Sequence, residues 1–93
     1  MNKPSEVLVE VFASPNCNRC GKASRLVATI VNKLGNEHIQ WREINVLENI
    51  DYAVQLGVMA TPAIAINGKL EFTSLPDRDK LSATLQDYIS DHR

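Results

Sequence analysis

The chain has two cysteines, Cys17 and Cys20, which are separated by two residues. An apolar run over residues 7–13 precedes them, and a strongly helical stretch over residues 22–34 follows. This context predicts that Cys17 stands at the start of a helix and Cys20 one turn inside it, close enough to form a disulfide. A helix N-terminus favours negative charge, so the first thiol is expected to ionise more readily than a free one. Such a thiolate can attack a substrate disulfide, and its neighbour can then resolve the mixed disulfide.

The C-x-x-C spacing by itself leaves three interpretations open, namely redox chemistry, a zinc site and a pair of buried structural cysteines. A structural zinc site needs four nitrogen or sulfur ligands, and His38 and His92 are remote from each other and from the cysteines. Proline, asparagine, arginine and glycine surround the thiols, which indicates an exposed turn rather than a buried site. The strand–loop–helix setting therefore favours redox chemistry.

Length and composition indicate one small domain over residues 1–93. Hydrophobic residues make up 44% and charged residues 23%, as in ordinary globular proteins, and a net charge of −1 argues against a nucleic-acid binder. No run approaches the roughly 20 apolar residues of a membrane span. The first residues lack the apolar core of a signal peptide, so a cytoplasmic location is expected. There, a lone cysteine pair is more often catalytic or metal-binding than structural.

The hydrophobic pattern predicts the order β-α-β-α-β-β-α. Strands are predicted over residues 6–13, 39–46, 63–66 and 70–73, and helices over residues 17–34, 48–56 and from Asp77 onward. The sequence Asn67-Gly68 is a strong signal for a tight hairpin between the last two strands. The connection rules then give an α/β fold, with a four-stranded mixed sheet covered by three helices.

This order of elements, the C-x-x-C pair after the first strand and a Thr-Pro before the third strand together resemble the thioredoxin fold. The similarity is closest to small, glutaredoxin-sized thioredoxin-like proteins of archaea and bacteria. It is carried by the segments FASPNC (residues 12–17), INVLEN (residues 44–49) and VMATP (residues 58–62). The resemblance extends from about residue 6 to residue 89.

The resemblance implies a thiol–disulfide oxidoreductase that acts on disulfide-containing proteins, with Cys17 as the attacking cysteine and Cys20 as the resolving one. It also implies that Pro62 is a cis-proline beside the disulfide and that the backbone of Thr61 pairs with an extended substrate. Spacing alone would instead make Pro62 an ordinary trans-proline at a strand start. Arg19 can lower the pKa of a neighbouring thiol, or it can be a solvated surface residue. No metal and no bound organic cofactor are implied.

The chain departs from the family pattern at several positions. Val11 stands six residues before Cys17, where thioredoxins carry a buried aspartate that helps to deprotonate the resolving cysteine; strand alternation turns the adjacent Glu10 to the opposite face. Residues 73–76 and Arg19 replace the Gly-Gly and the aromatic residue that glutaredoxins carry. The implied electron donor is therefore a flavin-dependent thioredoxin reductase, acting on a monomer. The alternatives are a glutathione-dependent glutaredoxin and a C-x-x-C module that binds Cu(I) or Zn(II).

Other prominent side chains are interpreted as structural. Trp41 is expected to pack on the sheet rather than to serve as a substrate platform. Lys69 and Glu71 are expected to be solvated charges on the edge strand. Tyr52 and Tyr88 are expected to pack on helices with their hydroxyls in water.

Overall fold

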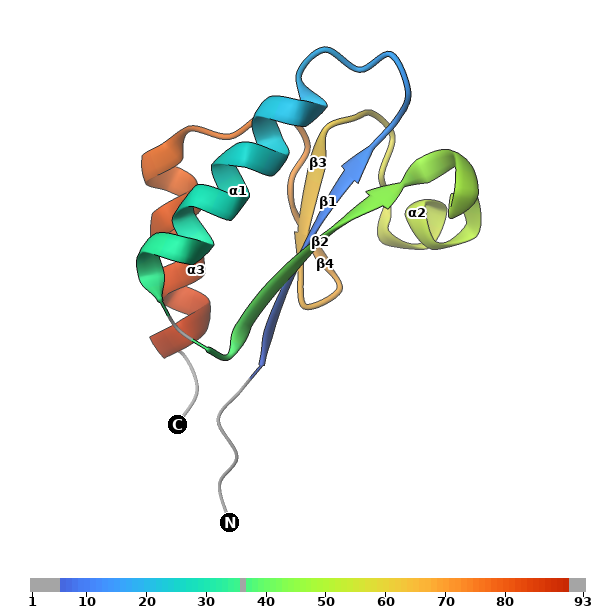
Figure 1. Cartoon of the computed structure of the whole chain (residues 1–93). Coiled ribbons are helices and arrows are strands. Elements are labelled where there is room, and N and C mark those ends of the chain that lie inside the picture. The colour runs from blue at the N-terminus through green and yellow to red at the C-terminus, as the bar shows by residue number, and fades with distance from the viewer. Residues whose placement is uncertain (1–5, 36, 91–93) are drawn as a thin grey trace.

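A computed structural model describes residues 6–35 and 37–90 and contains one sheet with the strand order β2-β1-β3-β4 (Figure 1). The elements are β1 (Val7–Ala13), α1 (Cys20–Leu34), β2 (Ile39–Asn45), the 3-10 turn η1 (Val46–Glu48), α2 (Ile50–Leu56), β3 (Ala63–Ile66), β4 (Lys69–Phe72) and α3 (Arg78–Ser90). β1 pairs in parallel with β2 and antiparallel with β3, and β4 adds an antiparallel edge to β3. The predicted order of elements and the mixed sheet are confirmed.

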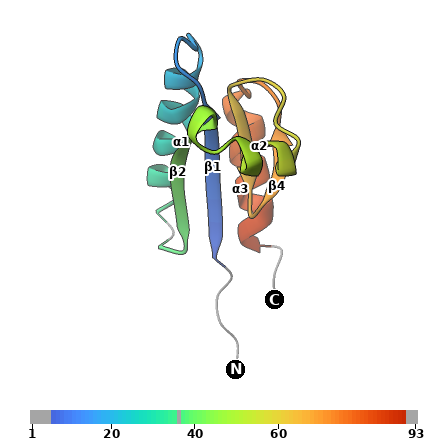
Figure 2. The same cartoon turned by 90° about the vertical axis from the view of Figure 1, so that its right-hand side faces the viewer.

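Helices cover both faces of the sheet. α1 and α3 lie side by side on one face, and α2 lies alone on the other (Figures 1 and 2). The larger core is on the α1/α3 face and contains Val7, Val9, Val11, Ala23, Val27, Ile30, Ile39, Ile64, Ile66, Leu81 and Leu85. The smaller core lies under α2 and contains Phe12, Ile44, Ala53, Ala63 and Ala65. Successive β1 side chains point to opposite faces, so this one strand supplies both cores.

Local sequence signals account for the turns. Asn67 and Gly68 have φ values of 52° and 81°, and two successive positive φ values are what a tight two-residue hairpin requires. Gly35, with φ of 59°, ends α1, and its N–H donates to the carbonyl of Val31 at 3.2 Å. The predicted hairpin and the predicted end of the first helix are therefore confirmed.

The predicted start of the first helix is wrong. α1 begins at Cys20, with Arg19 as its N-cap, and Cys17 precedes the helix. Asn16 has a left-handed backbone with φ of 64°, so the chain is still turning as it enters the cysteine pair. The N–H of Ala23 donates to the carbonyl of Arg19 at 3.0 Å, which is where regular helical bonding starts.

The second helix also begins later than predicted. Residues 46–48 form the separate turn η1, in which the side chain of Asn45 accepts a hydrogen bond from the N–H of Leu47 at 2.9 Å. α2 then starts at Ile50 rather than at Glu48. The asparagine cap stabilises the short turn in place of another turn of α-helix.

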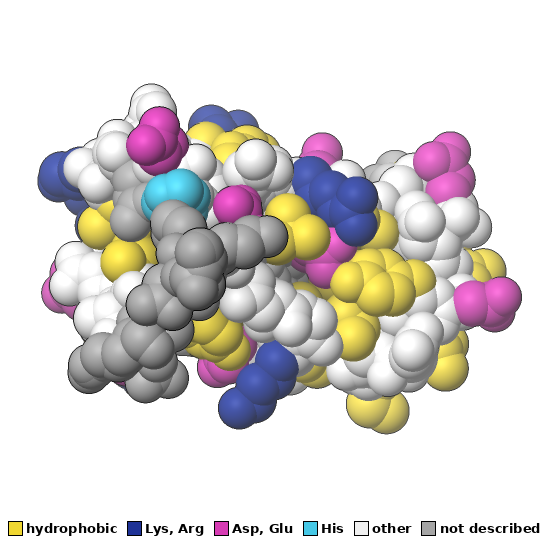
Figure 3. All heavy atoms as spheres, turned by 90° about the horizontal axis from the view of Figure 1, so that it is seen from below, with side chains coloured by type: hydrophobic (Ala, Val, Ile, Leu, Met, Phe, Trp, Pro, Cys, Tyr) yellow, Lys and Arg dark blue, Asp and Glu magenta, His cyan; other side chains and the backbone are white. Residues whose placement is uncertain are grey.

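The described helices and the face drawn in Figure 3 bear on membrane and polyanion binding. No helix within residues 6–35 and 37–90 is long and apolar enough to cross a membrane. Outside the grey residues of Figure 3, basic side chains are scattered among other types on that face rather than gathered into a stripe. A phosphate backbone is bound by gathered basic residues, so this face lacks that feature.

Candidate functional site

Cys17 and Cys20 form a disulfide, with their Cα atoms 5.5 Å apart. That separation is within the usual range of roughly 4.4–6.8 Å. Cys17 is partly exposed, whereas Cys20 is only 4% exposed. The two sulfurs therefore differ sharply in access, although they belong to one bond.

The burial of Cys20 follows from its place on α1. It is the first residue of the helix and heads the buried stripe that continues through Ala23, Val27 and Ile30. Residues three or four apart lie on the same side of a helix, so this stripe packs as a unit against the sheet. Cys20 is thus buried at the head of the α1 stripe, while Cys17 stays in the preceding loop.

Cys17 lines a shallow hollow of about 420 Å³ at the surface. The other lining residues are Ser14, Asn16, Asn18, Arg19 and Thr61. Arg19 is exposed and Thr61 is partly exposed. The structure therefore brings two of the predicted site residues, Arg19 and Thr61, to the same hollow as Cys17.

The peptide bond between Thr61 and Pro62 is cis, and Pro62 is buried. The expectation of a cis-proline is confirmed, and the alternative of an ordinary trans-proline is wrong. Thr61 lines the hollow and stands two residues before the start of β3. The pairing of its backbone with a substrate stays a prediction.

A hydrogen bond that sequence reasoning missed joins the two loops of the site. The hydroxyls of Ser14 and Thr61 lie 2.8 Å apart, and the pair is partly buried. Ser14 stood inside a recognisable motif, but the pattern assigned it no role. The contact joins residues 47 positions apart, so no local signal in the sequence could have revealed it.

The acid next to Val11 is buried on the other face of the sheet. Arg42 donates to Oε2 of Glu10 from Nε at 2.9 Å and from Nη2 at 2.6 Å, and the hydroxyl of Tyr52 donates to Oε1 at 2.5 Å. The predicted orientation of Glu10 is confirmed, while the predicted solvated hydroxyl of Tyr52 is wrong. Because it donates to Glu10, and because burial adds to the effect, the pKa of Tyr52 is raised above its ordinary value.

Tyr88 makes a comparable bond on the α1/α3 side, where its hydroxyl donates to the carboxylate of Glu71. Burial, reinforced by this hydrogen bond, raises the pKa of Tyr88 to about 12. The predicted solvated hydroxyl is wrong here as well. Nζ of Lys69 lies 4.0 Å from the same carboxylate, so Glu71 is not a free edge charge. Trp41 packs against the larger core, as predicted.

The described residues contain no cluster of three or more metal-ligating side chains. Within residues 6–35 and 37–90, no group of three or more His, Cys, Asp or Glu side chains is placed to hold a metal ion. Nδ1 of His38 lies 3.7 Å from a carboxylate oxygen of Glu6, and His92 lies outside the described residues. A C-x-x-C metal module would therefore have only the two cysteines as ligands from this part of the chain.

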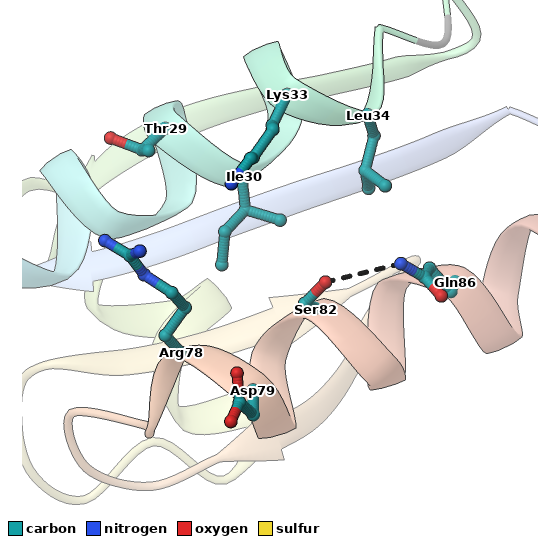
Figure 4. Close-up of a pocket in the computed structure, with 8 residues that line it drawn as sticks. All are labelled: Thr29, Ile30, Lys33, Leu34, Arg78, Asp79, Ser82 and Gln86. Atoms are coloured by element: carbon teal, nitrogen blue, oxygen red, sulfur yellow. Dashed lines mark hydrogen bonds between the residues drawn. The ribbon is translucent and has the colours of Figure 1, made fainter.

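A second hollow, of about 330 Å³, lies between α1 and α3 (Figure 4). Thr29, Ile30, Lys33 and Leu34 line it from α1, and Arg78, Asp79, Ser82 and Gln86 line it from α3. None of these residues belongs to the cysteine loop or to the loop that carries Thr61. This hollow is therefore separate from the one that Cys17 lines.

Comparison with known proteins identifies the family. A family model described as a thioredoxin domain matches residues 7–86. The chain is 39% identical to a thioredoxin of Methanocaldococcus jannaschii over 77 residues, which cover 83% of this chain and 89% of the relative. The chain belongs to the thioredoxin family. A probable thioredoxin of Methanothermobacter marburgensis is 36% identical over 83 residues, which cover 89% of this chain and 96% of that protein.

Solved structures agree with this assignment. A protein disulfide oxidoreductase from Aeropyrum pernix superposes with a TM-score of 0.79 at 32% identity, covering 95% of this chain and 39% of that one. A mutant thioredoxin from Halobacterium salinarum superposes with a TM-score of 0.77 over 92% of this chain and 77% of its own, and at 22% identity this likeness shows the fold alone. Together with the C-x-x-C disulfide, the relatives show a thioredoxin fold with thiol–disulfide oxidoreductase function.

Proposed function

We propose that the protein reduces disulfides of protein substrates, with Cys17 as the nucleophile and Cys20 as the resolving thiol. The observation that supports this assignment is the contrast in access. Cys17 opens into a polar hollow, while Cys20 is 4% exposed. A substrate disulfide can therefore reach Cys17 from the hollow, whereas Cys20 is shielded from solvent.

The exchange proceeds in two balanced steps. The Cys17 thiolate attacks one sulfur of the substrate disulfide, a mixed disulfide forms, and the other substrate sulfur leaves as a thiolate that takes up a proton. Cys20 then loses its proton and attacks Sγ of Cys17, which restores the Cys17–Cys20 bond and releases the second substrate sulfur. Two electrons pass from the protein dithiol to the substrate, which is reduced.

In this proposal, the other residues of the hollow bind the substrate and stabilise the Cys17 thiolate. Thr61 borders the same hollow as Cys17, so its backbone can receive an extended substrate segment that presents a disulfide to that thiolate. Pro62 follows Thr61 in the chain, is buried, and directly precedes β3. Arg19 lines the hollow as a cation, and a nearby cation favours the thiolate form of a cysteine.

We further propose that a flavin-dependent thioredoxin reductase returns the electrons and that the protein acts as a monomer in the cytoplasm. Residues 73–76 and Arg19 support a protein donor over glutathione, because glutaredoxins carry a Gly-Gly and an aromatic residue at those places. A reducing compartment keeps a catalytic cysteine pair available as the dithiol.

Trapping experiments test the assignment of the two cysteines. With insulin as the disulfide substrate, Cys20→Ser should accumulate a mixed disulfide through Cys17, detectable by non-reducing electrophoresis and mass spectrometry. Cys17→Ser should trap almost nothing, because the remaining thiol is buried. Equal trapping by both variants would contradict the division of roles.

The donor is tested separately. Oxidised protein is mixed with NADPH and thioredoxin reductase, or with glutathione, NADPH and glutathione reductase, and NADPH consumption is followed. Faster reduction by glutathione would favour the glutaredoxin alternative. A protein that is purified with stoichiometric copper or zinc and that reduces no disulfide would instead be a metal-binding module.

A further inference from the structure

Two loops build the hollow around Cys17, and one side-chain hydrogen bond ties them together. The first loop follows β1 and carries Ser14, and the second precedes β3 and carries Thr61. We propose that Ser14 is a positioning residue for Thr61, because its hydroxyl holds Thr61 in the place from which its backbone receives an extended substrate. This inference rests on the proposed function.

The register of the sheet explains why the tie occurs at these residues. β1 and β3 pair antiparallel, and the last matched pair is Phe12 with Ala63. Continuing that register by two residues sets Ser14 directly opposite Thr61, with Pro62 in between. Proline has no N–H to donate, so the ladder cannot continue through it. Beyond the end of the backbone pairing, the hydrogen bond between the two hydroxyls, 2.8 Å long, joins the two segments.

The loop that carries Thr61 is fixed at its ends by Val58 and Pro62, but the residues between them make few contacts. Met59 is 95% exposed and Ala60 is also exposed. Within residues 6–35 and 37–90, the contact with Ser14 is the only hydrogen bond that Met59, Ala60 or Thr61 makes. Threonine is β-branched and stiff about χ1, so fixing its hydroxyl also restrains its backbone. Loss of the Ser14 hydroxyl should therefore loosen the receiving edge.

This role predicts selectivity between substrates. A small disulfide needs only access to Cys17, whereas an extended protein segment also needs the backbone of Thr61 in place. A pre-organised receiving edge improves binding because the ordering cost is already met in the free protein. Removing the Ser14 hydroxyl should thus weaken the binding of protein disulfides and leave the chemical step nearly intact.

The test uses reduced protein in single turnover, which requires no electron donor. Ser14→Ala is mixed with insulin, or with the small aromatic disulfide 5,5′-dithiobis(2-nitrobenzoate), over a range of concentrations. The half-saturating insulin concentration should rise by a factor of about 3 to 10, as expected for one lost hydrogen bond. The limiting rate and the rate with the small disulfide should change by less than about twofold, since the bond acts on binding alone.

Thr61→Val removes the other hydroxyl and keeps the β-branched shape, so it should raise the half-saturating insulin concentration in the same way. The double variant should be no worse than either single one, because both remove the same bond. Thr61→Val also carries the test if Ser14→Ala does not fold. Ser24→Ala is the matched control, because Ser24 donates to Glu43 at 3.1 Å outside the hollow, and it should leave insulin reduction unchanged.

Three results would be decisive against the inference or its basis. Equal effects of Ser14→Ala on both disulfides would overturn the inference, and so would a double variant whose effect is the product of the single ones. A wild-type protein that reduces the small disulfide but not insulin would overturn the proposed function instead. The two failures are thus distinguished by the wild type alone.

Discussion

Val11 and Glu10 are neighbours in β1, both are completely buried, and they lie in opposite environments. Val11 packs with apolar residues in the core under α1 and α3, and α1 is the helix that carries Cys20. Glu10 lies under α2, where Arg42 and Tyr52 together bond both of its carboxylate oxygens. One strand thus separates a dry, uncharged face from a face that holds a carboxylate.

The contrast shows where a buried charge is tolerated in this fold. Burying a carboxylate is costly unless donors replace the lost water, and on the α2 face Arg42 and Tyr52 are those donors. Glu10 is the only buried charged residue within residues 6–35 and 37–90. β1 therefore presents no acid to the face that holds Cys20, and the proposed resolving step must proceed without a carboxylate from this strand.

The largest expected effect tests whether the core on the α1/α3 face is more tightly packed than the core under α2. Leu85 of α3 is fully buried in the larger core, whereas Leu56 of α2 is only partly buried against the smaller one. Leu85→Ala should lower the free energy of unfolding by about 2–5 kcal/mol, since it leaves a cavity in a closed core. Leu56→Ala should cost clearly less. Urea unfolding of both variants measures the difference, and equal losses would mean that the α2 core is as tightly packed as the larger one.

Val11→Asp places an acid on the face that lacks one. Without donors on this face, the introduced carboxyl should destabilise the protein by about 3 kcal/mol at neutral pH. Burial should raise the folded-state pKa of this carboxyl above its unfolded value. The penalty is therefore present above the unfolded pKa of about 4 and lessens as the pH falls toward it. Denaturation at pH 7 and at pH 4.5 should show a smaller difference from the wild type at the lower pH.

The same variant should accelerate the resolving step, because the carboxylate can accept the proton of Cys20. Release of reduced substrate from the preformed mixed disulfide, followed by rapid quench, measures this step. Val11→Asn is the matched control, since it has nearly the same shape and polarity but no acid–base function. A similar acceleration in both variants would attribute the effect to loosened packing rather than to proton transfer.

Much of the fold could be predicted because its signals are local. The stripe of Ala23, Val27 and Ile30 and the Asn67-Gly68 hairpin each depend on neighbouring residues. The two cysteines were found in the same way, through their spacing and flanks. The start of α1 was misplaced because the left-handed backbone of Asn16 depends on the folded loop.

The polar contacts could not be predicted, because they join residues far apart in the sequence. The bond between Ser14 and Thr61 spans 47 positions, and that between Glu10 and Tyr52 spans 42. The face of Glu10 followed from strand alternation, but its partners did not. Arg42 faces Glu10 through the register of the β1–β2 pair, and Tyr52 reaches it through the packing of α2 over the sheet. No periodicity in the sequence encodes either the register or that packing.

Each face of the sheet has one hydrogen bond from a tyrosine to a glutamate, and the two bonds allow the faces to be compared directly. Tyr52→Phe would leave one oxygen of the buried Glu10 carboxylate without its donor, and should cost about 1–3 kcal/mol. Tyr88→Phe should cost less, because the side chain of Glu71 is 21% exposed and water can replace the donor, whereas that of Glu10 is 1% exposed. Urea unfolding at pH 7 compares the two variants. A larger loss of unfolding free energy in Tyr88→Phe than in Tyr52→Phe would contradict this expectation. It would mean that the hydrogen bond from Tyr52 to the buried Glu10 contributes little to stability.

The smallest expected effect appears only in alkali. The pKa of Tyr52 is raised by its bond to Glu10, and the pKa of Tyr88 is raised to about 12, chiefly by burial. Above the unfolded value of about 10, the unfolded chain releases these protons before the folded protein does, so stability falls as the pH rises. The stabilisation that these two raised pKa values provide is complete below about pH 10 and is lost as the pH rises through the folded-state values.

The wild type should therefore lose stability between pH 9 and pH 11 more steeply than either phenylalanine variant, as measured by urea unfolding at each pH. Parallel curves would show that these hydroxyls ionise alike in the folded and unfolded chain, and absorbance of tyrosinate in the folded protein would then show both groups titrating near pH 10.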